Sequence, residues 1–110
     1  TYEVYSTNVS GINNENKPIR FELKQNFPNP FNPSTEIEFS LNKSENVRLE
    51  IFDITGKSIK VLLNDNLDSG NHKISWNGKN NFDELLPTGV YFYRLNIANN
   101  AETRKMIMLK

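Results

Sequence analysis

The sequence contains no cysteine, which excludes disulfide bonds, thiol catalysis and thiolate metal sites. Secreted domains with an adequate apolar core manage without disulfides, so this absence does not restrict the chain to a reducing compartment. A chain of 110 residues has room for one domain. A domain of this size hides roughly 65% of the surface that its unfolded form exposes, which is enough for stability without covalent cross-links.

An excess of charge of either sign is also missing, since 13 basic residues balance 13 acidic ones. Domains that bind nucleic acids normally carry a basic excess or a basic stripe. Here Lys57, Lys60 and Lys73 alternate with apolar positions, as they would on an ordinary solvated strand. We therefore expect no nucleic-acid partner.

No apolar run is long enough to span a membrane, and the longest candidate, residues 106–109, is far too short. The basic and then apolar pattern of a signal peptide is missing as well, so we expect a piece of a longer protein whose leader lies outside this sequence. Residues 8–17 (NVSGINNENK) have the composition of a linker. The sequence thus predicts a linker or the tail of a preceding domain at residues 1–20 and the domain proper at residues 21–110. Residues 1–6 are expected to form a short strand, of which residues 2–5 either close an upstream domain or pair loosely with this one.

From residue 35 onward, short segments of alternating apolar and polar residues are separated by turn residues. The predicted strands are Thr35–Leu41 and residues 47–53, 57–63, 72–76, 90–97 and 102–109. Polar loops are expected at residues 64–71 and 77–88, a tight turn with a positive φ at Gly56, and a hairpin turn at Asn99 and Asn100. About seven strands without a helical period predict an all-β fold, an Ig-like antiparallel β-sandwich.

The alternation also predicts the core. The inner faces are expected to carry Ile37, Phe39, Leu49, Ile51, Ile59, Ile74, Trp76, Tyr91, Tyr93 and Leu95. The last strand is ambiguous, because either Met106 and Met108 or Ile107 and Leu109 could face inward. Its two partly apolar faces indicate that it is covered on both sides or contacts a partner.

No pattern typical of catalysis or metal binding is present. His72 alternates with apolar positions and lacks a nucleophile motif, so we expect a packed histidine. Asp83 and Glu84 are adjacent in a loop and do not form the opposed pair of a glycosidase. Residues 64–68 (NDNLD) resemble a calcium loop, but the glycine comes one position late and no glutamate follows. We predict that the domain is not an enzyme and that it holds no metal or cofactor.

Phe92 stands between two tyrosines, and a strand must turn it away from both of them. If Tyr91 and Tyr93 belong to the core, Phe92 is exposed or covered by a loop. An exposed aromatic ring on a sandwich could stack on a sugar, although packing is the commoner fate of an aromatic side chain.

The most unusual stretch is residues 25–35 (QNFPNPFNPST), which we call the proline segment. Pro28, Pro30 and Pro33 fix φ and remove backbone donors, so neither a helix nor a central strand can form here. The residues before them are pushed toward extended conformations. We expect a stiff segment that Phe27 and Phe31 anchor to an apolar surface, and that shields a sheet edge.

The proline segment is followed by EIEFSL, VRLEIFDITGKSIKVL, a stretch ending in WNG, PTGVYFYRL and ETRKMIMLK, in that order. This succession resembles the type A C-terminal sorting domain of the type IX secretion system, and it is similar to Ig-like domains of flagellar hook-cap proteins. In the loop after Trp76 the sequence departs from the family pattern. Asn77, Asn80 and Asn81 occupy positions that are usually acidic, and Asp83 falls near the usual glycine. The departure weakens the case for a cation in this loop.

The resemblance implies the last domain of a protein exported by a bacterium of the Bacteroidota type. Such a domain folds in the periplasm and is recognised by the outer-membrane translocon, so the expected localisation is secreted or cell surface. A surface sortase often removes it and attaches the covalently linked N-terminal cargo to lipopolysaccharide. The binding residues that the resemblance implies are Pro28, Asn29, Pro30, Phe31, Asn32, Pro33, Gly89, Tyr91, Lys105, Met106, Ile107, Met108, Leu109 and Lys110, with Gly56 also marked in the family pattern.

Two other functions stay open at this stage. The chain could be a passive accessory domain, in which case deleting residues 105–110 should change stability but not export of the parent. It could also be a carbohydrate-binding module of a secreted enzyme that uses Phe92. Under the sorting hypothesis, the last strand is the docking candidate, by packing or by pairing at its edge.

Overall fold

The computed structural model describes residues 2–3 and 18–110, and this part of the chain contains strands and no helix. The strands are β1 (Tyr2–Glu3), β2 (Arg20–Leu23), β3 (Thr35–Leu41), β4 (Glu45–Phe52), β5 (Ser58–Leu67), β6 (Gly70–Trp76), β7 (Gly89–Ile97) and β8 (Asn100–Met108). Apart from the two-residue β1, seven strands build the domain, which agrees with the predicted number, although no strand was predicted at the position of β2. The linker predicted at residues 8–17 lies outside the described residues.

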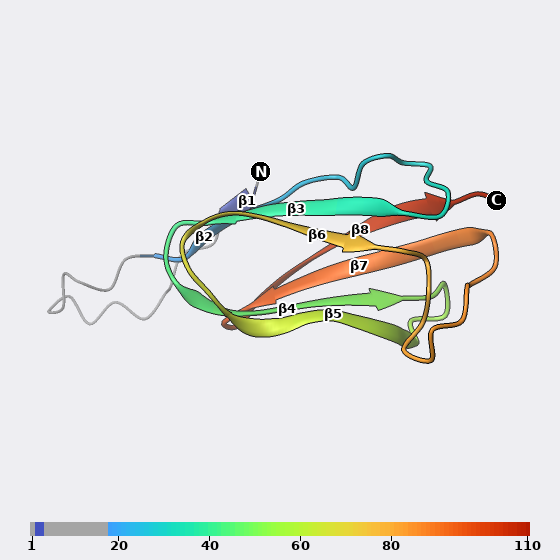
Figure 1. Cartoon of the computed structure of the whole chain (residues 1–110). Coiled ribbons are helices and arrows are strands. Elements are labelled where there is room, and N and C mark those ends of the chain that lie inside the picture. Colours follow the sequence, from blue (N-terminus) through green and yellow to red (C-terminus); the bar gives the residue numbers. More distant parts are fainter. Residues whose placement is uncertain (1, 4–17) are drawn as a thin grey trace, which may run out of the picture.

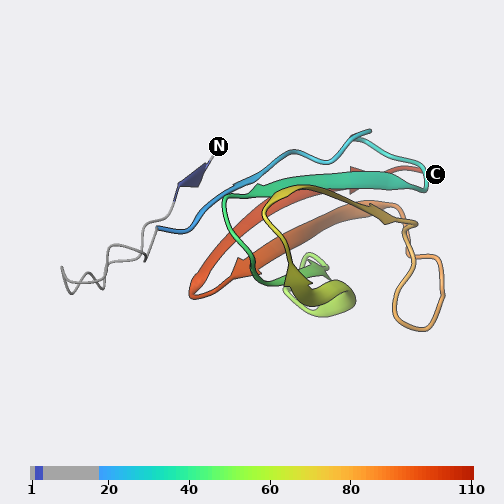
Figure 2. The same ribbon diagram turned by 60° about the vertical axis from the view of Figure 1, so that its left-hand side comes forward.

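The strands form two antiparallel sheets packed face to face (Figure 1). One sheet has the order β1-β2-β3-β6 and the other the order β5-β4-β7-β8. Three connections, β3 to β4, β5 to β6 and β6 to β7, cross from one sheet to the other, as in the Greek keys of Ig-like sandwiches. The predicted all-β sandwich is therefore confirmed. Figure 2 shows the same two layers from the side, with the C terminus beside the start of β3.

Alternating side chains from both sheets fill the space between the layers. The buried apolar residues are Phe21, Leu23, Phe31, Ile37, Phe39, Leu41, Val47, Leu49, Ile51, Trp76, Tyr91, Tyr93, Leu95, Ile97, Met106 and Met108. Ile59 and Ile74 were expected inside, but they are only partly buried because β5 and β6 are edge strands. The register decides the ambiguous last strand, since Met106 lies opposite Tyr91 and thus faces inward with it.

Two local predictions are wrong. Residues 64–67 are not a loop, because β5 continues to Leu67 and pairs with the first half of β4. The last hairpin turns at Ala98 and Asn99, since Ile97 pairs with Asn100, and Ala98 takes the positive φ of 53°. The predicted positive φ at Gly56 is confirmed at 87°.

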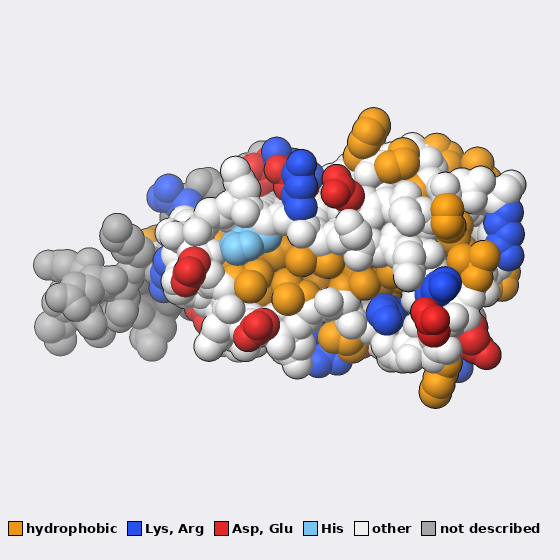
Figure 3. Space-filling model, viewed as in Figure 1, with side chains coloured by type: hydrophobic (Ala, Val, Ile, Leu, Met, Phe, Trp, Pro, Cys, Tyr) orange, Lys and Arg blue, Asp and Glu red, His pale blue; other side chains and the backbone are white. Residues whose placement is uncertain are grey.

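The two long sides of the sandwich differ. On the side drawn in Figure 3, the edge strands β5 and β6 face each other, and an apolar strip lies between the sheets near the histidine. On the opposite side, the proline segment crosses from β2 to the edge of β8. The candidate functional site lies around this crossing of the proline segment.

Candidate functional site

The proline segment closes the edge of β8. The amide of Phe31 donates to the carbonyl of Ile107 at 2.9 Å, and the amide of Leu109 donates to the carbonyl of Phe31 at 2.9 Å. The Asn29 side chain accepts from the amide of Ile107 at 3.0 Å, and the Gln25 side chain donates to the carbonyl of Lys105 at 2.7 Å. The carbonyl of Lys105, both backbone groups of Ile107 and the amide of Leu109 thus have partners at the outer edge of the last strand, which confirms the predicted edge shield. A partner therefore cannot dock by pairing a strand with this part of the last strand.

The conformation of the proline segment differs from a uniformly extended one. It makes only two bridges, one between Phe27 and Glu36 and one, parallel, between Phe31 and Met108. The peptide bonds before Pro28, Pro30 and Pro33 are all cis. Through its two bridges, the segment joins β3 of one sheet to β8 of the other.

The two phenylalanines of the segment have opposite environments. Phe31 is 1% exposed, and its ring centroid lies 5.6 Å from that of Trp76, which in turn makes an edge contact of 5.8 Å with Tyr91. Phe27 is 79% exposed, so the prediction that it anchors the segment is wrong. Of the two phenylalanines, Phe31 is therefore the one that packs in the core, where an aromatic pair adds to the stabilisation from burying its rings.

The loop after β6 closes against the same residues. A Cβ atom at Gly78 would lie 2.8 Å from the sulfur of Met108 and 3.0 Å from the carbonyl oxygen of Pro33, and the φ of Gly78 is +77°. Glycine is therefore required here for space and for conformation. The Trp76 indole donates to the carbonyl of Lys79 at 2.9 Å. These contacts join the WNG stretch, the proline segment and the last strand at one end of the sandwich, which we call the closed end.

Tyr91 has a structural task at the closed end. Its hydroxyl donates to the carbonyl of Pro87, four residues earlier, at 2.6 Å. A tyrosine near the start of such a strand that bonds back to the preceding corner is a hallmark of Ig-like domains. The bond fixes the path of the chain just before Gly89.

A buried polar cluster under the proline segment was not predicted from the sequence. Asn26 is 2% exposed, and its side chain donates to Pro28 and to the Thr35 hydroxyl, at 3.2 and 3.0 Å. The Tyr93 hydroxyl accepts from the amide of Asn26 at 2.8 Å and donates to the carbonyl of Lys24 at 2.7 Å. Because buried polar groups need partners, this cluster sets where the segment leaves β2.

Burial raises the pKa of Tyr93 to about 12, above the ordinary value of about 10. The folded state therefore keeps the phenolic proton longer than the unfolded chain does. Stability should be unaffected by this group well below pH 10 and should fall by about 2 kcal/mol as the pH rises from 10 to 12. Chemical denaturation at pH 7, 10 and 12 measures this fall.

The Tyr93→Phe variant is the control for this prediction. At pH 7 it should lose about 1–3 kcal/mol, because the amide of Asn26 and the carbonyl of Lys24 lose their partner. Between pH 10 and 12 it should lose less stability than the wild type. Equal alkaline losses in both proteins would show that Tyr93 does not titrate as its burial implies.

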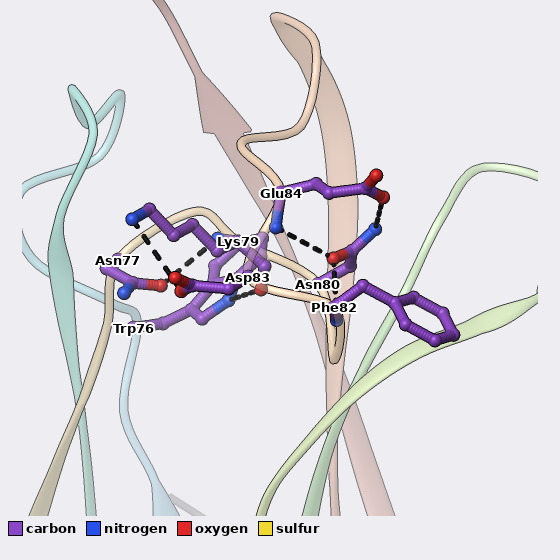
Figure 4. A network of polar contacts seen from close by, with 7 residues as sticks. All are labelled: Trp76, Asn77, Lys79, Asn80, Phe82, Asp83 and Glu84. Atoms are coloured by element: carbon purple, nitrogen blue, oxygen red, sulfur yellow. Dashed lines mark hydrogen bonds and ion pairs between the residues drawn. The ribbon is translucent and has the colours of Figure 1, made fainter.

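The 77–88 loop is ordered by its own side chains, as Figure 4 shows. The side-chain Oδ1 of Asn80 accepts from the amides of Phe82 and Glu84, at 2.9 and 3.0 Å. Asp83 pairs with Lys79 at 3.6 Å and has a φ of 63°, the left-handed region that favours glycine. Phe82 is 82% exposed and points away from this network.

The binding residues implied by the resemblance fall into three groups by exposure. Phe31, Tyr91, Met106 and Met108 are buried and hold the closed end together. Gly89 and Ile107 are half-buried. The exposed members are Pro28, Asn29, Pro30, Asn32, Pro33, Lys105, Leu109 and Lys110. Only the exposed and half-buried members can contact another protein while the domain stays folded.

The remaining candidates for chemistry have structural surroundings. The ring of His72 stacks on Phe39 at 5.4 Å, and its Nε2 lies 2.8 Å from the carbonyl oxygen of Asp68. Among residues 2–3 and 18–110, no cluster of three His, Cys, Asp or Glu side chains could hold a metal ion. The same residues contain no helix long and apolar enough to cross a membrane.

The crossings between the sheets, the tyrosine corner at Tyr91 and the closed end together define an Ig-like β-sandwich domain. Residues 25–109 match the family model of the secretion system C-terminal sorting domain, and the chain belongs to this family. The family predicted from the proline segment and the later blocks is thereby confirmed. The comparison with curated proteins gives no significant match.

Solved structures share the fold at low sequence identity. The dimeric latent PorU of Porphyromonas gingivalis matches 84% of this chain, with a TM-score of 0.68 and 22% identity. FlgD of P. aeruginosa matches 67% of it, over 58% of its own length, with a TM-score of 0.53 and 20% identity. PorZ, an essential surface component of the type IX secretion system of P. gingivalis, matches 82%, with a TM-score of 0.52 and 16% identity. The chain corresponds to 9% of the PorU chain and 11% of the PorZ chain.

Proposed function

We propose that this domain directs an exported parent protein through the outer-membrane translocon of the type IX secretion system. The observation that carries the proposal is the family match over residues 25–109, which includes both the proline segment and the last strand. The fold shared with parts of PorU and PorZ supports it. In this role the domain folds in the periplasm, acts without catalysis and delivers a covalently linked N-terminal cargo to the cell surface or the medium.

The proposal includes removal of the domain by a surface sortase and attachment of the cargo to the cell surface. The exposed residues of the proline segment and of the C-terminal end, among them Asn32, Pro33, Leu109 and Lys110, are the parts of the family pattern that such partners can reach. Recognition rests on a surface, because the buried members of the pattern are used by the core.

An export assay tests the proposal. A reporter with a signal peptide is fused in front of the whole chain and expressed in a bacterium with a type IX system. We expect the reporter on the cell surface or in the medium, and in the periplasm of a matched strain without the translocon. A reporter that stays periplasmic in both strains, while a known sorting domain exports the same reporter, would favour the passive accessory domain instead.

A further inference from the structure

A cleft of about 340 Å³ opens on the outer face of the sheet that contains β8. Its lining residues are Phe52, Asp53, Ile54, Thr55, Gly56, Phe92, Arg94 and Thr103. Phe52 and Phe92 are cross-strand partners in β4 and β7, which are neighbours in Figure 1. The turn after β4 contributes half of the lining residues and forms the rim. Ile54, in this turn, is 72% exposed. The cleft therefore offers a half-buried aromatic floor and an exposed aliphatic edge, and it is large enough to receive one large side chain.

Arg94 is held in place inside this cleft. Its guanidinium carbon lies 4.6 Å from the centroid of the Phe52 ring, and its Nε donates to the Thr103 hydroxyl at 3.2 Å. Both contacts leave the two terminal nitrogens of the guanidinium for another acceptor. An arginine fixed in this way loses little freedom when it binds a carboxylate with both terminal nitrogens.

The carboxylates near Arg94 are already used. Glu50 lies directly opposite Arg94 in the sheet, but its two oxygens accept from Arg48 at 3.0 Å and from the hydroxyl of Ser58. Asp53 accepts from the Thr55 hydroxyl and from the amides of Thr55 and Lys57, and these bonds hold the pKa of Asp53 below its ordinary value. The local acids thus leave Arg94 without an ion pair among residues 18–110.

A second cation lies beside the cleft. Lys105 is exposed on β8 directly opposite Phe92, and within the described residues no carboxylate lies within ion-pair distance of it. The apolar floor is therefore flanked by two cations that face solvent. A partner surface that is complementary to this cleft would carry an apolar side chain with carboxylates next to it.

We propose that this cleft is the docking point for a protein partner that inserts an apolar side chain and pairs a neighbouring carboxylate with Arg94. The inference rests on the proposed export function and names the surface that the secretion machinery contacts. A protein fits better than a sugar for two reasons. The Arg94 guanidinium lies over the Phe52 ring and occupies the place that a sugar would take on that face. Ile54 on the rim is an exposed aliphatic side chain, which gains from burial against another protein but offers no aromatic face to a sugar.

The export assay described above, with the whole chain behind the reporter, tests the cleft through surface variants. Ile54→Asp puts a negative charge on its rim at a position that is 72% exposed, so folding should be unaffected. We expect at least a tenfold loss of export. The matched control is Phe82→Asp, an equally exposed apolar side chain in another loop, which should export within twofold of the wild type.

Two arginine variants refine the test. Arg94→Lys keeps the charge but loses the two-pronged geometry, so its export should lie between those of the wild type and Arg94→Glu. Thermal unfolding of each purified chain checks that it remains folded.

The outcomes separate the two proposals. A wild-type reporter that is not exported overturns the export function and, with it, this inference. Wild-type export together with normal export of folded Ile54→Asp and Arg94→Glu overturns the inference alone. Binding of the same variants to cell-surface polysaccharide is measured as well. Normal export together with loss of this binding would assign the cleft to a sugar and overturn the proposal of a protein partner.

Discussion

Replacing Phe31 with alanine should lower the free energy of unfolding by about 3–5 kcal/mol, the usual cost of removing a buried phenylalanine. Phe31 is 1% exposed and packs on Trp76, so the change leaves a cavity beneath the proline segment. For a domain of this size, each kcal/mol corresponds to a shift of roughly 4–8 °C in the melting temperature. Urea denaturation followed by tryptophan fluorescence measures the loss, because the only tryptophan is the contact partner.

Phe27→Ala is the matched control, since it removes the same side chain from the same segment. Phe27 is 79% exposed, and its two backbone bonds with Glu36 do not need the ring. We expect a change of less than about 0.5 kcal/mol. Similar losses in the two variants would contradict the assignment of Phe31 as the anchor of the segment.

A chain that ends at Ile107 should lose about 3–5 kcal/mol of stability. The deletion removes Met108, which is fully buried, and a buried methionine replaced by alanine already costs about 2–5 kcal/mol. It also removes the amide of Leu109, which donates to the carbonyl of Phe31. A chain that ends at Leu109 is the control, because the exposed Lys110 makes no contact that holds the fold. A fully stable chain ending at Ile107 would show that the last strand does not close the core.

This expected loss changes how the sorting and passive hypotheses can be separated. The sequence suggested that deleting residues 105–110 would leave the export of a passive domain unchanged. Met106 and Met108 are core residues, so the deletion weakens the fold whatever the domain does. Surface changes such as Ile54→Asp separate the two hypotheses better, because they leave the core intact.

Most of the fold was predictable, because a strand that is buried on one face shows alternating apolar and polar residues in its sequence. β3, β4 and β7 were found almost to the residue. The end of β5 was missed, since residues 64–67 (NDNL) are typical of turns and only their pairing with β4 keeps them in the sheet. The turn of the last hairpin was misplaced by one residue, because pairing across the hairpin outweighs the preference of asparagine for a left-handed position.

The site was less predictable, because it depends on contacts between distant segments. The three prolines predicted that the proline segment shields a sheet edge, but no local pattern in the segment indicates that Asn29 bonds to Ile107. Asn26 and Thr35 are typical turn residues, and only the structure shows them buried with Tyr93. The cleft was missed for the same reason, although the sequence did single out Phe92 as a residue that a loop could cover.

The bridge between Phe31 and Met108 has a consequence for how a parent protein is made. The proline segment, near the start of the domain, is held by residues 107–109 near its other end, so the closed end cannot form until residue 109 has been synthesised. A protein whose translation stops between these two segments therefore carries an incomplete sandwich. If export depends on the folded domain, such a truncated protein is not exported.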